Sequence, residues 1–398
     1  MKSVYIIHAK RTPIGRLGGK LSHVRVDDML ANLFREFKDS FDFDMKEIDD
    51  VIAGCANQAG EDNRNLARMS SLLAGLPFEV PGVTLNRLCA SSLDSIVDGW
   101  SRIQAGVADC ILVGGAESMT RAPFVMSKPS AAFGRDSKMY DTTFGWRFPN
   151  PKMKEMFPLY GMGETAEEVA EKLNISRADQ DQFALNSHLK AIKAWEQGKF
   201  NNEVTPVDVK LRKESFTVSK DEGPRADTTL EKMSKLRTVF RQDGTVTAGN
   251  ASSMNDGAAC VAIVSEEFLK RHNLTPLVEI TGAGVRGIHP NIMGLGPVES
   301  TNTLMRKFGK KISDFDVVEL NEAFAAQSLG CIRELGLNEE IVNLNGGAIS
   351  LGHPLGCSGA RIVTTLTHIM DQNKSLKEGL ASMCIGVGQG VSLSVKNC

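Results

Sequence analysis

The sequence predicts an α/β protein made of two similar halves, with an irregular segment inserted into the first half. Short runs of β-branched residues alternate with longer helical patterns in the first half. The same order begins again near residue 277. Between the halves, residues 121–249 lack that rhythm and contain several prolines. A chain of 398 residues is long enough to form two or three domains, each with its own core.

The first half alternates strands and helices along the chain. Strands are predicted at residues 4–7, 51–54, 83–86, 110–114 and, much later, 260–264. Helices are predicted at residues 27–37, 66–76 and around 93–103, because apolar residues recur there at helical spacing. This alternation is typical of a sheet covered by helices.

The second half repeats this order. Strands are predicted from residue 277, at 317–320 and at 341–345, and helices at 299–308 and 323–335. We expect the run at 108–114 in the first half to correspond to the run at 381–387 in the second. Two similar halves suggest a site at the interface between them.

Residues 121–249 are interpreted as an inserted lid or loop domain. They contain one convincing helical pattern, at 178–195, whereas 127–140 is predicted to be irregular. Loops of this length usually bind something. The expected organisation is therefore 1–120 and 250–272 for the first half, 121–249 for the insertion and 273–398 for the second half.

Composition excludes several classes of protein. Hydrophobic residues make up 42% of the chain, charged residues 24%, and the net charge is −2, which argues against a basic nucleic-acid binder. The apolar run at the start is too short for a signal peptide core or a membrane span. Eight cysteines occur singly, without CxxC pairs or zinc-like spacing. We therefore expect a cytoplasmic protein with reduced thiols, no metal, no nucleic-acid partner and no membrane association.

Cys89 follows a predicted strand and stands at the start of a predicted helix. Unpaired N–H groups and the helix dipole at that place lower the pKa of a thiol, so we expect a larger thiolate fraction near neutral pH. The alternative is one more buried, inert cysteine, which is the commoner case.

His353 lies in a glycine-rich loop after a predicted strand, where it could act as a base close to a ligand. The alternative is a tight turn with a solvated histidine. The other six histidines lack comparable surroundings and are predicted to pack or to face water.

Two further segments could carry chemistry. Cys384 leads into alternating glycines, whose N–H groups could stabilise an oxyanion by about 3 kcal/mol each, although a strand that closes with a glycine-rich turn is the favoured interpretation of this segment alone. Asn321 stands where a strand ends and a helix begins, so it could cap the helix or orient a catalytic water.

Five segments together resemble the thiolase family. NRLCASS, GNASSMNDGAA, NEAFAAQ, GGAISLGHPLGCSGAR and CIGVGQG occur in the order found in thiolases, and the resemblance spans nearly the whole chain. It implies two βαβαβαββ halves in five α/β/α/β/α layers with an inserted loop domain, commonly assembled as homodimers or homotetramers. It also implies thiolytic cleavage of a 3-ketoacyl-CoA, or the reverse Claisen condensation.

The resemblance assigns the catalytic roles residue by residue. Cys89 corresponds to the acylated nucleophile, His353 to the base that activates it and Cys384 to the acid/base cysteine. His353 and a water bound by Asn321 would stabilise the thioester oxyanion, and the N–H groups of Cys89 and Gly386 the other oxyanion.

The resemblance also implies how CoA is bound. The corresponding residues are Arg225, Ala248, Ser252, Met162, Ala323 and Phe324. CoA is then a substrate, and no cofactor is expected. The residue before Met162 is Gly161, where some biosynthetic thiolases have a histidine, so their polar contact to substrate is not expected here.

Two segments of the insertion suggest which acyl chain the substrate carries. Segments 121–126 and 141–148 resemble the β-ketoadipyl-CoA branch, whose substrate carries a distal carboxylate; Arg121 or Arg147 could bind that carboxylate or form ordinary ion pairs. The alternatives are an acetyl-CoA acetyltransferase that forms acetoacetyl-CoA, a condensing enzyme similar to HMG-CoA synthase, and a non-catalytic lipid carrier. Cys384 argues against the second, and the complete catalytic set against the third.

Overall fold

The computed structural model describes residues 2–398. Its strands are β1 (Val4–Arg11), β2 (Gly15–Arg16), β3 (Asp50–Gly54), β4 (Gly82–Leu85), β5 (Cys110–Ser118), β6 (Phe124–Met126), β7 (Met139–Asp141), β8 (Val207–Lys210), β9 (Ser215–Val218), β10 (Asn255–Ser265), β11 (Val278–Gly287), β12 (Val317–Leu320), β13 (Glu378–Ile385) and β14 (Gln389–Asn397). Its α-helices are α1 (Val26–Asp39), α2 (Leu66–Leu73), α3 (Ser91–Gln104), α4 (Pro151–Met156), α5 (Met162–Lys172), α6 (Arg177–Glu196), α7 (Leu230–Ser234), α8 (Glu266–Arg271), α9 (Gly296–Phe308), α10 (Ala325–Leu335), α11 (Ala348–Leu351) and α12 (Leu355–Gln372). Most predicted elements of both halves are present.

The main sheet has ten strands and runs through both halves. Its order is β12-β13-β14-β11-β1-β10-β5-β3-β4, and β2 pairs with β10. The halves meet where β1 pairs with β11 through Tyr5↔Glu279 and Ile6↔Val278. The pairs β3–β4, β3–β5 and β12–β13 are parallel and the remaining pairs are antiparallel. Each half thus contributes one half-sheet.

The predicted repeat is confirmed by the strand order. Read outward from the junction, the first half gives β1-β10-β5-β3 and the second gives β11-β14-β13-β12. Asp49 accepts the N–H of Cys110 at 3.0 Å, and Asp316 accepts that of Glu378 at 3.1 Å, so these positions correspond. The predicted match of 108–114 with 381–387 is therefore wrong by several residues, because runs of small and β-branched residues do not define a register.

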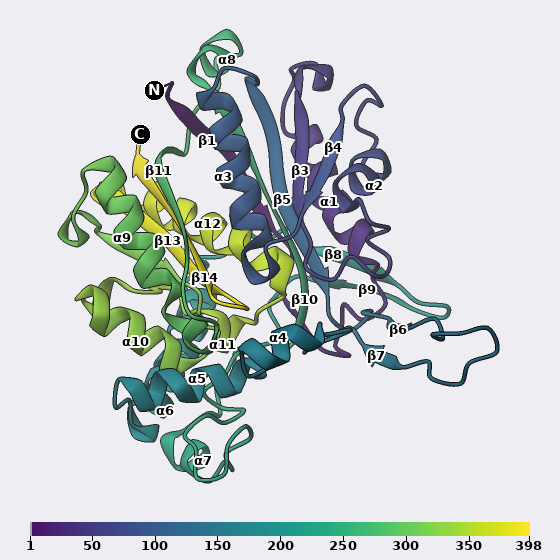
Figure 1. The fold of residues 1–398 in the computed structure, drawn as a ribbon. Helices are drawn as coiled ribbons and strands as arrows, with labels where there is room; N and C mark the ends of the chain where they lie inside the picture. The colour runs from purple at the N-terminus through teal and green to yellow at the C-terminus, as the bar shows by residue number, and fades with distance from the viewer. Residues whose placement is uncertain (1) are drawn as a thin grey trace.

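The layers follow from which helices cover which face. Helices α3 and α12 pack against each other between the two half-sheets, α1 and α2 cover the outer face of the first, and α9 and α10 cover that of the second (Figure 1). Burial of apolar side chains on both faces of each half-sheet provides the main stabilisation. The five α/β/α/β/α layers expected from the thiolase resemblance are present.

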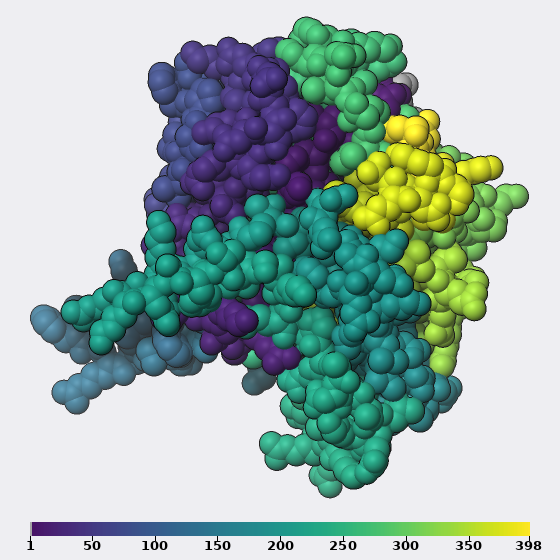
Figure 2. All heavy atoms as spheres, turned by 180° about the vertical axis from the view of Figure 1, so that it is seen from behind, coloured from purple at the N-terminus to yellow at the C-terminus, as the bar shows by residue number. Residues whose placement is uncertain are grey.

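The insertion contains two small hairpins and four helices. Helix α6 confirms the helix predicted at 178–195, and Ser176 caps it by accepting the N–H of Asp179 at 3.1 Å. The hairpin β6–β7 projects away from the body (Figure 1). The valines of β8–β9 belong to the same buried core as α1. From the opposite side, the teal atoms of the insertion cover the lower part of the molecule, below both halves (Figure 2).

The strand predicted at 341–345 is wrong. Residues Glu339–Ile341 form a 3₁₀ turn, and Val342 makes a single isolated bridge with Val318. Asn343 adopts φ 48° and binds Leu320 with its side-chain amide, at 2.8 Å to both the N–H and the carbonyl. A side chain therefore replaces the backbone pairing that a strand would make. None of the helices within residues 2–398 has both the length and the apolar character needed to cross a membrane.

Candidate active site

A cavity of about 770 Å³ lies where the insertion meets the two halves. The three side chains predicted to react, Cys89, His353 and Cys384, all line it. The residues expected to contact CoA line it as well: Arg225, Ala248, Ser252, Met162, Ala323 and Phe324. Residues far apart in the sequence are therefore gathered around one space large enough for part of a CoA thioester.

Cys89 is presented by a tight connection between β4 and α3. Leu88, just before it, has a φ of 48°, which is uncommon for a residue with a side chain. Ser91 holds the turn, because its hydroxyl donates to the Leu88 carbonyl at 2.6 Å and accepts the N–H of Arg87 at 3.0 Å. The thiol of Cys89 consequently points from the turn into the cavity, where it remains partly accessible.

The pKa of Cys89 is raised, mainly by burial, although the backbone N–H groups of Gly386 and of Cys89 itself act in the opposite direction. The prediction of a lowered thiol pKa at this helix start is therefore wrong, because desolvation exceeds the effect of the N–H groups. The thiol keeps its proton at neutral pH and needs a base to become a nucleophile. The two N–H groups near the sulfur are suitably placed to bind an oxygen of a group attached to it.

His353 is held with one ring nitrogen free. Its backbone N–H donates to Oδ1 of Asn255 at 2.9 Å, and its Nδ1 lies 2.7 Å from Oγ of Ser358. The Ser358 hydroxyl donates its only proton to the Pro354 carbonyl at 3.0 Å, so Nδ1 carries the proton of the ring. The buried Nε2 has no hydrogen-bond partner within the described chain and is left as an acceptor.

The charge state of His353 suits a base. Burial, with a smaller contribution from Arg361, lowers its pKa to about 4. The imidazole is therefore neutral at neutral pH and can take the proton of Cys89.

Cys89 and His353 occupy equivalent places in the repeat. Cys89 stands two residues before α3 and His353 two residues before α12, and these two helices pack against each other in the central layer. The pairing of a cysteine with a histidine from the other half follows directly from this arrangement.

Cys384 lies near the end of β13, just before the turn to β14. In this turn, Val387 has a φ of 63° and Gly388 a φ of 82°. The pKa of the Cys384 thiol is raised well above its ordinary value, first by burial and then by the neighbouring Cys89. Cys384 therefore holds its proton firmly and can act as a proton donor.

Asn321 does not cap a helix, because α10 begins only at Ala325, with Phe324 as its N-cap. Its backbone N–H donates to Ser382 at 3.0 Å, two residues before Cys384. Its fully buried amide has no hydrogen-bond partner at either Nδ2 or Oδ1 among residues 2–398. Asn321 itself does not line the cavity. A buried amide without a partner favours a bound water, which fits the alternative in which it orients a water.

Two buried carboxylates that the sequence did not single out support these loops. Glu322 accepts the hydroxyl of Ser187 at 2.7 Å, the amide of Asn343 at 2.8 Å and the N–H of Ile349 at 3.1 Å. It thereby joins the end of β12 to α6 and α11. A buried carboxylate needs hydrogen-bond donors, so burial of Glu322 would have indicated that it joins neighbouring segments. The sequence does not show that Glu322 is buried.

Glu117, at the end of β5, joins the two halves. Its carboxylate accepts the N–H groups of Ala56 and Gly356 at 2.9 Å each and that of Asn57 at 3.2 Å. Burial raises its pKa to about 7, although these N–H groups act to lower it. The start of α12, and with it His353, is tied to the half that carries Cys89.

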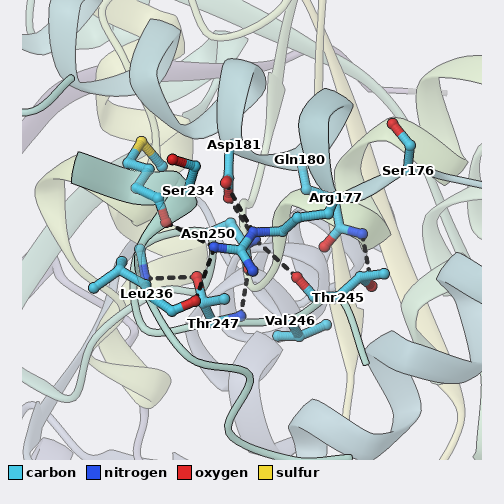
Figure 3. A network of polar contacts seen from close by, with 12 residues as sticks. Ser176, Arg177, Gln180, Asp181, Ser234, Leu236, Thr245, Val246, Thr247 and Asn250 are labelled. Carbon is cyan, nitrogen blue, oxygen red and sulfur yellow. Dashed lines mark hydrogen bonds and ion pairs between the residues drawn. The ribbon is translucent and has the colours of Figure 1, made fainter. Parts of the chain in front are cut away.

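Backbone and side-chain bonds hold the last part of the insertion and the residues just after it. Ser252 donates its N–H to Ala323 at 3.0 Å, and Ala251 forms a bridge with Phe324. Within the insertion, Arg177 donates to the carbonyls of Met233 at 2.7 Å and Leu236 at 3.1 Å (Figure 3). These bonds fix the segment that forms the expected pantetheine side of the cavity.

Asn250 completes this polar network. Its Nδ2 donates to Asp181 at 2.9 Å, and its Oδ1 accepts the N–H of Thr247 at 2.8 Å (Figure 3). Asp181 in turn accepts Nε of Arg177 at 2.8 Å. The N-terminal part of α6 thus holds the turn that carries Ala248.

His188 is buried, as predicted, and in addition lines the cavity. Its Nδ1 accepts the N–H of Arg225 at 3.2 Å, which fixes the backbone of that residue. Burial and the charges of Arg225 and Arg16 lower its pKa to about 4, so it stays neutral. The helical pattern at 178–195 showed no feature that separated this histidine from an ordinary buried one.

The two arginines considered for a distal carboxylate do not line the cavity. Arg121 forms a two-pronged ion pair with Glu61, at 2.5 and 2.6 Å. Arg147 donates to the carbonyls of Asn57 at 2.6 Å and Thr142 at 3.3 Å. Both therefore have structural roles. In the part of the chain that the structure describes, no three His, Cys, Asp or Glu side chains are grouped in a way that could hold a metal ion.

Comparisons with known proteins agree along the whole chain. Residues 4–267 match the family described as "Thiolase, N-terminal domain", and residues 274–397 match "Thiolase, C-terminal domain". The chain is 51% identical over 398 residues to a β-ketoadipyl-CoA thiolase of Pseudomonas aeruginosa, with 99% of each chain covered. It is 51% identical over 397 residues to a 3-oxoadipyl-CoA/3-oxo-5,6-dehydrosuberyl-CoA thiolase of Escherichia coli, again with 99% of each covered. Human mitochondrial 3-ketoacyl-CoA thiolase in complex with CoA has a TM-score of 0.92 and 39% identity, covering 100% of this chain and 98% of that one.

Proposed function

This chain belongs to the thiolase family, and we propose that its substrate is 3-oxoadipyl-CoA. As a thiolase it is an acyltransferase that cleaves a 3-ketoacyl-CoA with CoA. For 3-oxoadipyl-CoA, cleavage between C2 and C3 yields acetyl-CoA and succinyl-CoA. The names of two relatives at 51% identity support this substrate, because both specify a dicarboxylic 3-oxoacyl chain.

In the first half-reaction, Nε2 of His353 takes the proton of the Cys89 thiol, and the sulfur attacks C3 of the substrate. The oxygen on C3 becomes an alkoxide, which the N–H groups of Cys89 and Gly386 bind. Cleavage of the C2–C3 bond leaves an acyl group on Cys89 and the enolate of acetyl-CoA. The Cys384 thiol then protonates C2 of that enolate, and acetyl-CoA departs.

While it forms, the enolate oxygen of acetyl-CoA needs its own donors. His353 has just become protonated at Nε2 and can donate from that atom, together with a water held by Asn321. The unpartnered state of both side chains supports this assignment, because each offers polar atoms that no residue within 2–398 uses.

In the second half-reaction, the Cys384 thiolate takes the proton of the CoA thiol. The resulting thiolate attacks the acyl carbon on Cys89, and the C–S bond to Cys89 breaks as the shortened acyl-CoA forms. Protonated His353 returns its proton to the Cys89 sulfur, so both cysteines and the histidine end as they began. The observation that carries the mechanism is the gathering of a neutral base with a free nitrogen and two protonated thiols around one cavity.

The test of the substrate is a comparison of thiolysis rates. We expect kcat/KM to be highest for 3-oxoadipyl-CoA among 3-oxoadipyl-CoA, acetoacetyl-CoA and 3-oxooctanoyl-CoA, each with CoA as the second substrate. A maximum with acetoacetyl-CoA would instead identify an acetyl-CoA acetyltransferase. A maximum with the octanoyl substrate would identify a thiolase of uncharged chains.

We also propose that copies of the chain assemble into a dimer or tetramer. Strand β4 ends the main sheet with an unpaired edge, and the projecting β6–β7 hairpin exposes Phe133, Met126 and Met139. Exposed apolar side chains on a protruding hairpin suit burial against another copy. Light scattering during size-exclusion chromatography measures the mass, and a monomer would contradict the proposal. The need for two reduced thiols supports a cytoplasmic location, which fractionation of the source cells would test.

A further inference from the structure

Three cationic side chains other than histidine line the cavity: Arg16, Arg225 and Lys232. Lys232 is already engaged, because its Nζ lies 2.9 Å from the Asp227 carboxylate and 2.7 Å from the Asp227 carbonyl. Arg225 and Lys232 both belong to the insertion and are exposed, as expected for residues near the CoA phosphates at a cavity mouth. Arg16 differs in belonging to the wall formed by the first half.

Arg16 is fixed close to the catalytic base. It lies on the short strand β2, where it pairs with Asn255 of β10. The side chain of Asn255 donates to the Gly15 carbonyl at 2.9 Å and accepts the N–H of His353 at 2.9 Å. A single asparagine thus connects the backbone of the Arg16 strand with that of His353.

The guanidinium of Arg16 has little to bind within the protein. Its Nη2 donates to the Gly223 carbonyl at 3.1 Å, and no ion pair joins it to a carboxylate of residues 2–398. The nearby Glu222 carboxylate accepts backbone N–H groups instead, from Arg16 at 3.1 Å and Lys20 at 3.0 Å. Apolar side chains share the cavity wall, namely Leu17, Met119 and Met254 of the first half and Phe144 of the insertion. A half-buried cation without a counter-ion in such a wall favours an anionic ligand.

We propose that Arg16 binds the distal carboxylate of the acyl chain and so selects dicarboxylic substrates. The inference rests on the substrate proposed above. In 3-oxoadipyl-CoA the carboxylate carbon lies three C–C bonds beyond C3, a reach of about 4 Å, so its partner must stand close to Cys89 and His353. A long, flexible arginine side chain that forms two parallel hydrogen bonds can follow a carboxylate over a short range of chain lengths.

The test compares 3-oxoadipyl-CoA with 3-oxohexanoyl-CoA, which has the same number of carbons and a methyl group in place of the carboxylate. We expect Arg16→Met to reduce the preference for the dicarboxylic substrate, measured as the ratio of the two kcat/KM values, by about 10- to 100-fold. Arg16→Lys, which keeps the charge and loses the paired geometry, should give an intermediate ratio. Arg135→Met, the same change on an exposed arginine of the β6–β7 hairpin, is the matched control and should leave the ratio unchanged.

The outcomes separate this inference from the proposed substrate. If the unaltered protein shows no preference for 3-oxoadipyl-CoA, the substrate proposal is wrong. If it shows the preference and Arg16→Met keeps the same ratio, the assignment of Arg16 is wrong. An equal loss on both substrates, with a raised KM for CoA, would show that Arg16 binds a CoA phosphate and would also overturn the assignment. Circular dichroism and melting temperature establish that each variant is folded.

Discussion

Nδ1 of His353 lies 2.7 Å from the hydroxyl of Ser358, which itself donates to the Pro354 carbonyl. Because a hydroxyl has only one proton, this contact keeps the imidazole proton on Nδ1 and leaves Nε2 free to accept one. Ser358→Ala removes the acceptor, so the ring can place its proton on Nε2. We expect kcat/KM for thiolysis to fall about 10- to 100-fold, since general bases contribute on that scale or more.

The matched control for this variant is Ser95→Ala. Ser95 is a buried serine of α3 whose hydroxyl also donates to a carbonyl four residues earlier, at 2.9 Å, and touches no histidine. Both variants should lose similar stability, measured by urea unfolding, whereas only Ser358→Ala should lose activity. Equal activity losses would show that Ser358 matters only for packing.

Replacing Asn321 should separate activity from stability. Its amide is buried without a partner, so Asn321→Leu removes an uncompensated polar group of similar size. We expect the melting temperature to stay equal or rise, while kcat falls about 100-fold through loss of an oxyanion donor. Thermal unfolding and steady-state kinetics check the two effects. A lower melting temperature with full activity would mean that the amide is structural.

Replacing each of the two cavity cysteines should block a different step of the reaction. Cys89→Ser should prevent formation of an acyl-enzyme, because a hydroxyl is a much weaker nucleophile here, and mass spectrometry of the substrate-treated protein detects that adduct. Cys384→Ala should leave Cys89 reactive toward iodoacetamide and lower turnover by about 100-fold or more, because the proton donor is missing.

A buried cysteine outside the site provides the control for both variants. Cys260 lies in β10, within the core beneath α1, so Cys260→Ala should reduce stability and leave turnover close to that of the unaltered protein. Full thiolytic activity in either Cys89→Ser or Cys384→Ala would refute the mechanism.

The dependence of kcat/KM on pH should reflect the shifted pKa values of His353 and Cys384. His353 must be neutral to accept a proton, and its pKa of about 4 means that it stays neutral until the pH falls toward 4. Cys384 must be protonated to act as the acid, and its raised pKa preserves the proton at alkaline pH. We expect kcat/KM for thiolysis to be flat from about pH 5 to pH 9. If kcat/KM instead falls with a midpoint near pH 6.5, the ordinary pKa of histidine, burial does not lower the pKa of His353.

The sequence predicts the two halves and most of their elements because apolar periodicity marks helix faces and strand runs directly. Local pattern alone marks Cys89, His353 and Cys384 only weakly; their roles follow from the thiolase resemblance, and the structure brings the three side chains to one cavity. The strand predicted at 341–345 fails because the buried amide of Asn343 makes bonds that local pattern does not record. The capping role considered for Asn321 fails because α10 begins four residues later, at Ala325. The lowered pKa expected for Cys89 fails because desolvation depends on tertiary packing. Glu117 and Arg16 contact partners distant in sequence, which local pattern does not reveal. Ser358 is only five residues from His353, but its contact with Nδ1 depends on the turn between them.

The equivalent positions of Cys89 and His353 have an evolutionary consequence. In a symmetric dimer made of two identical half-length chains, the turns before the central helices would carry the same residue twice. Two cysteines would lack a base, and two histidines would lack a nucleophile. Joining both copies in one polypeptide allows each turn to accumulate its own substitutions. A single polypeptide can therefore place a cysteine in one turn and a histidine in the equivalent turn, which two copies of one half-length chain could not do.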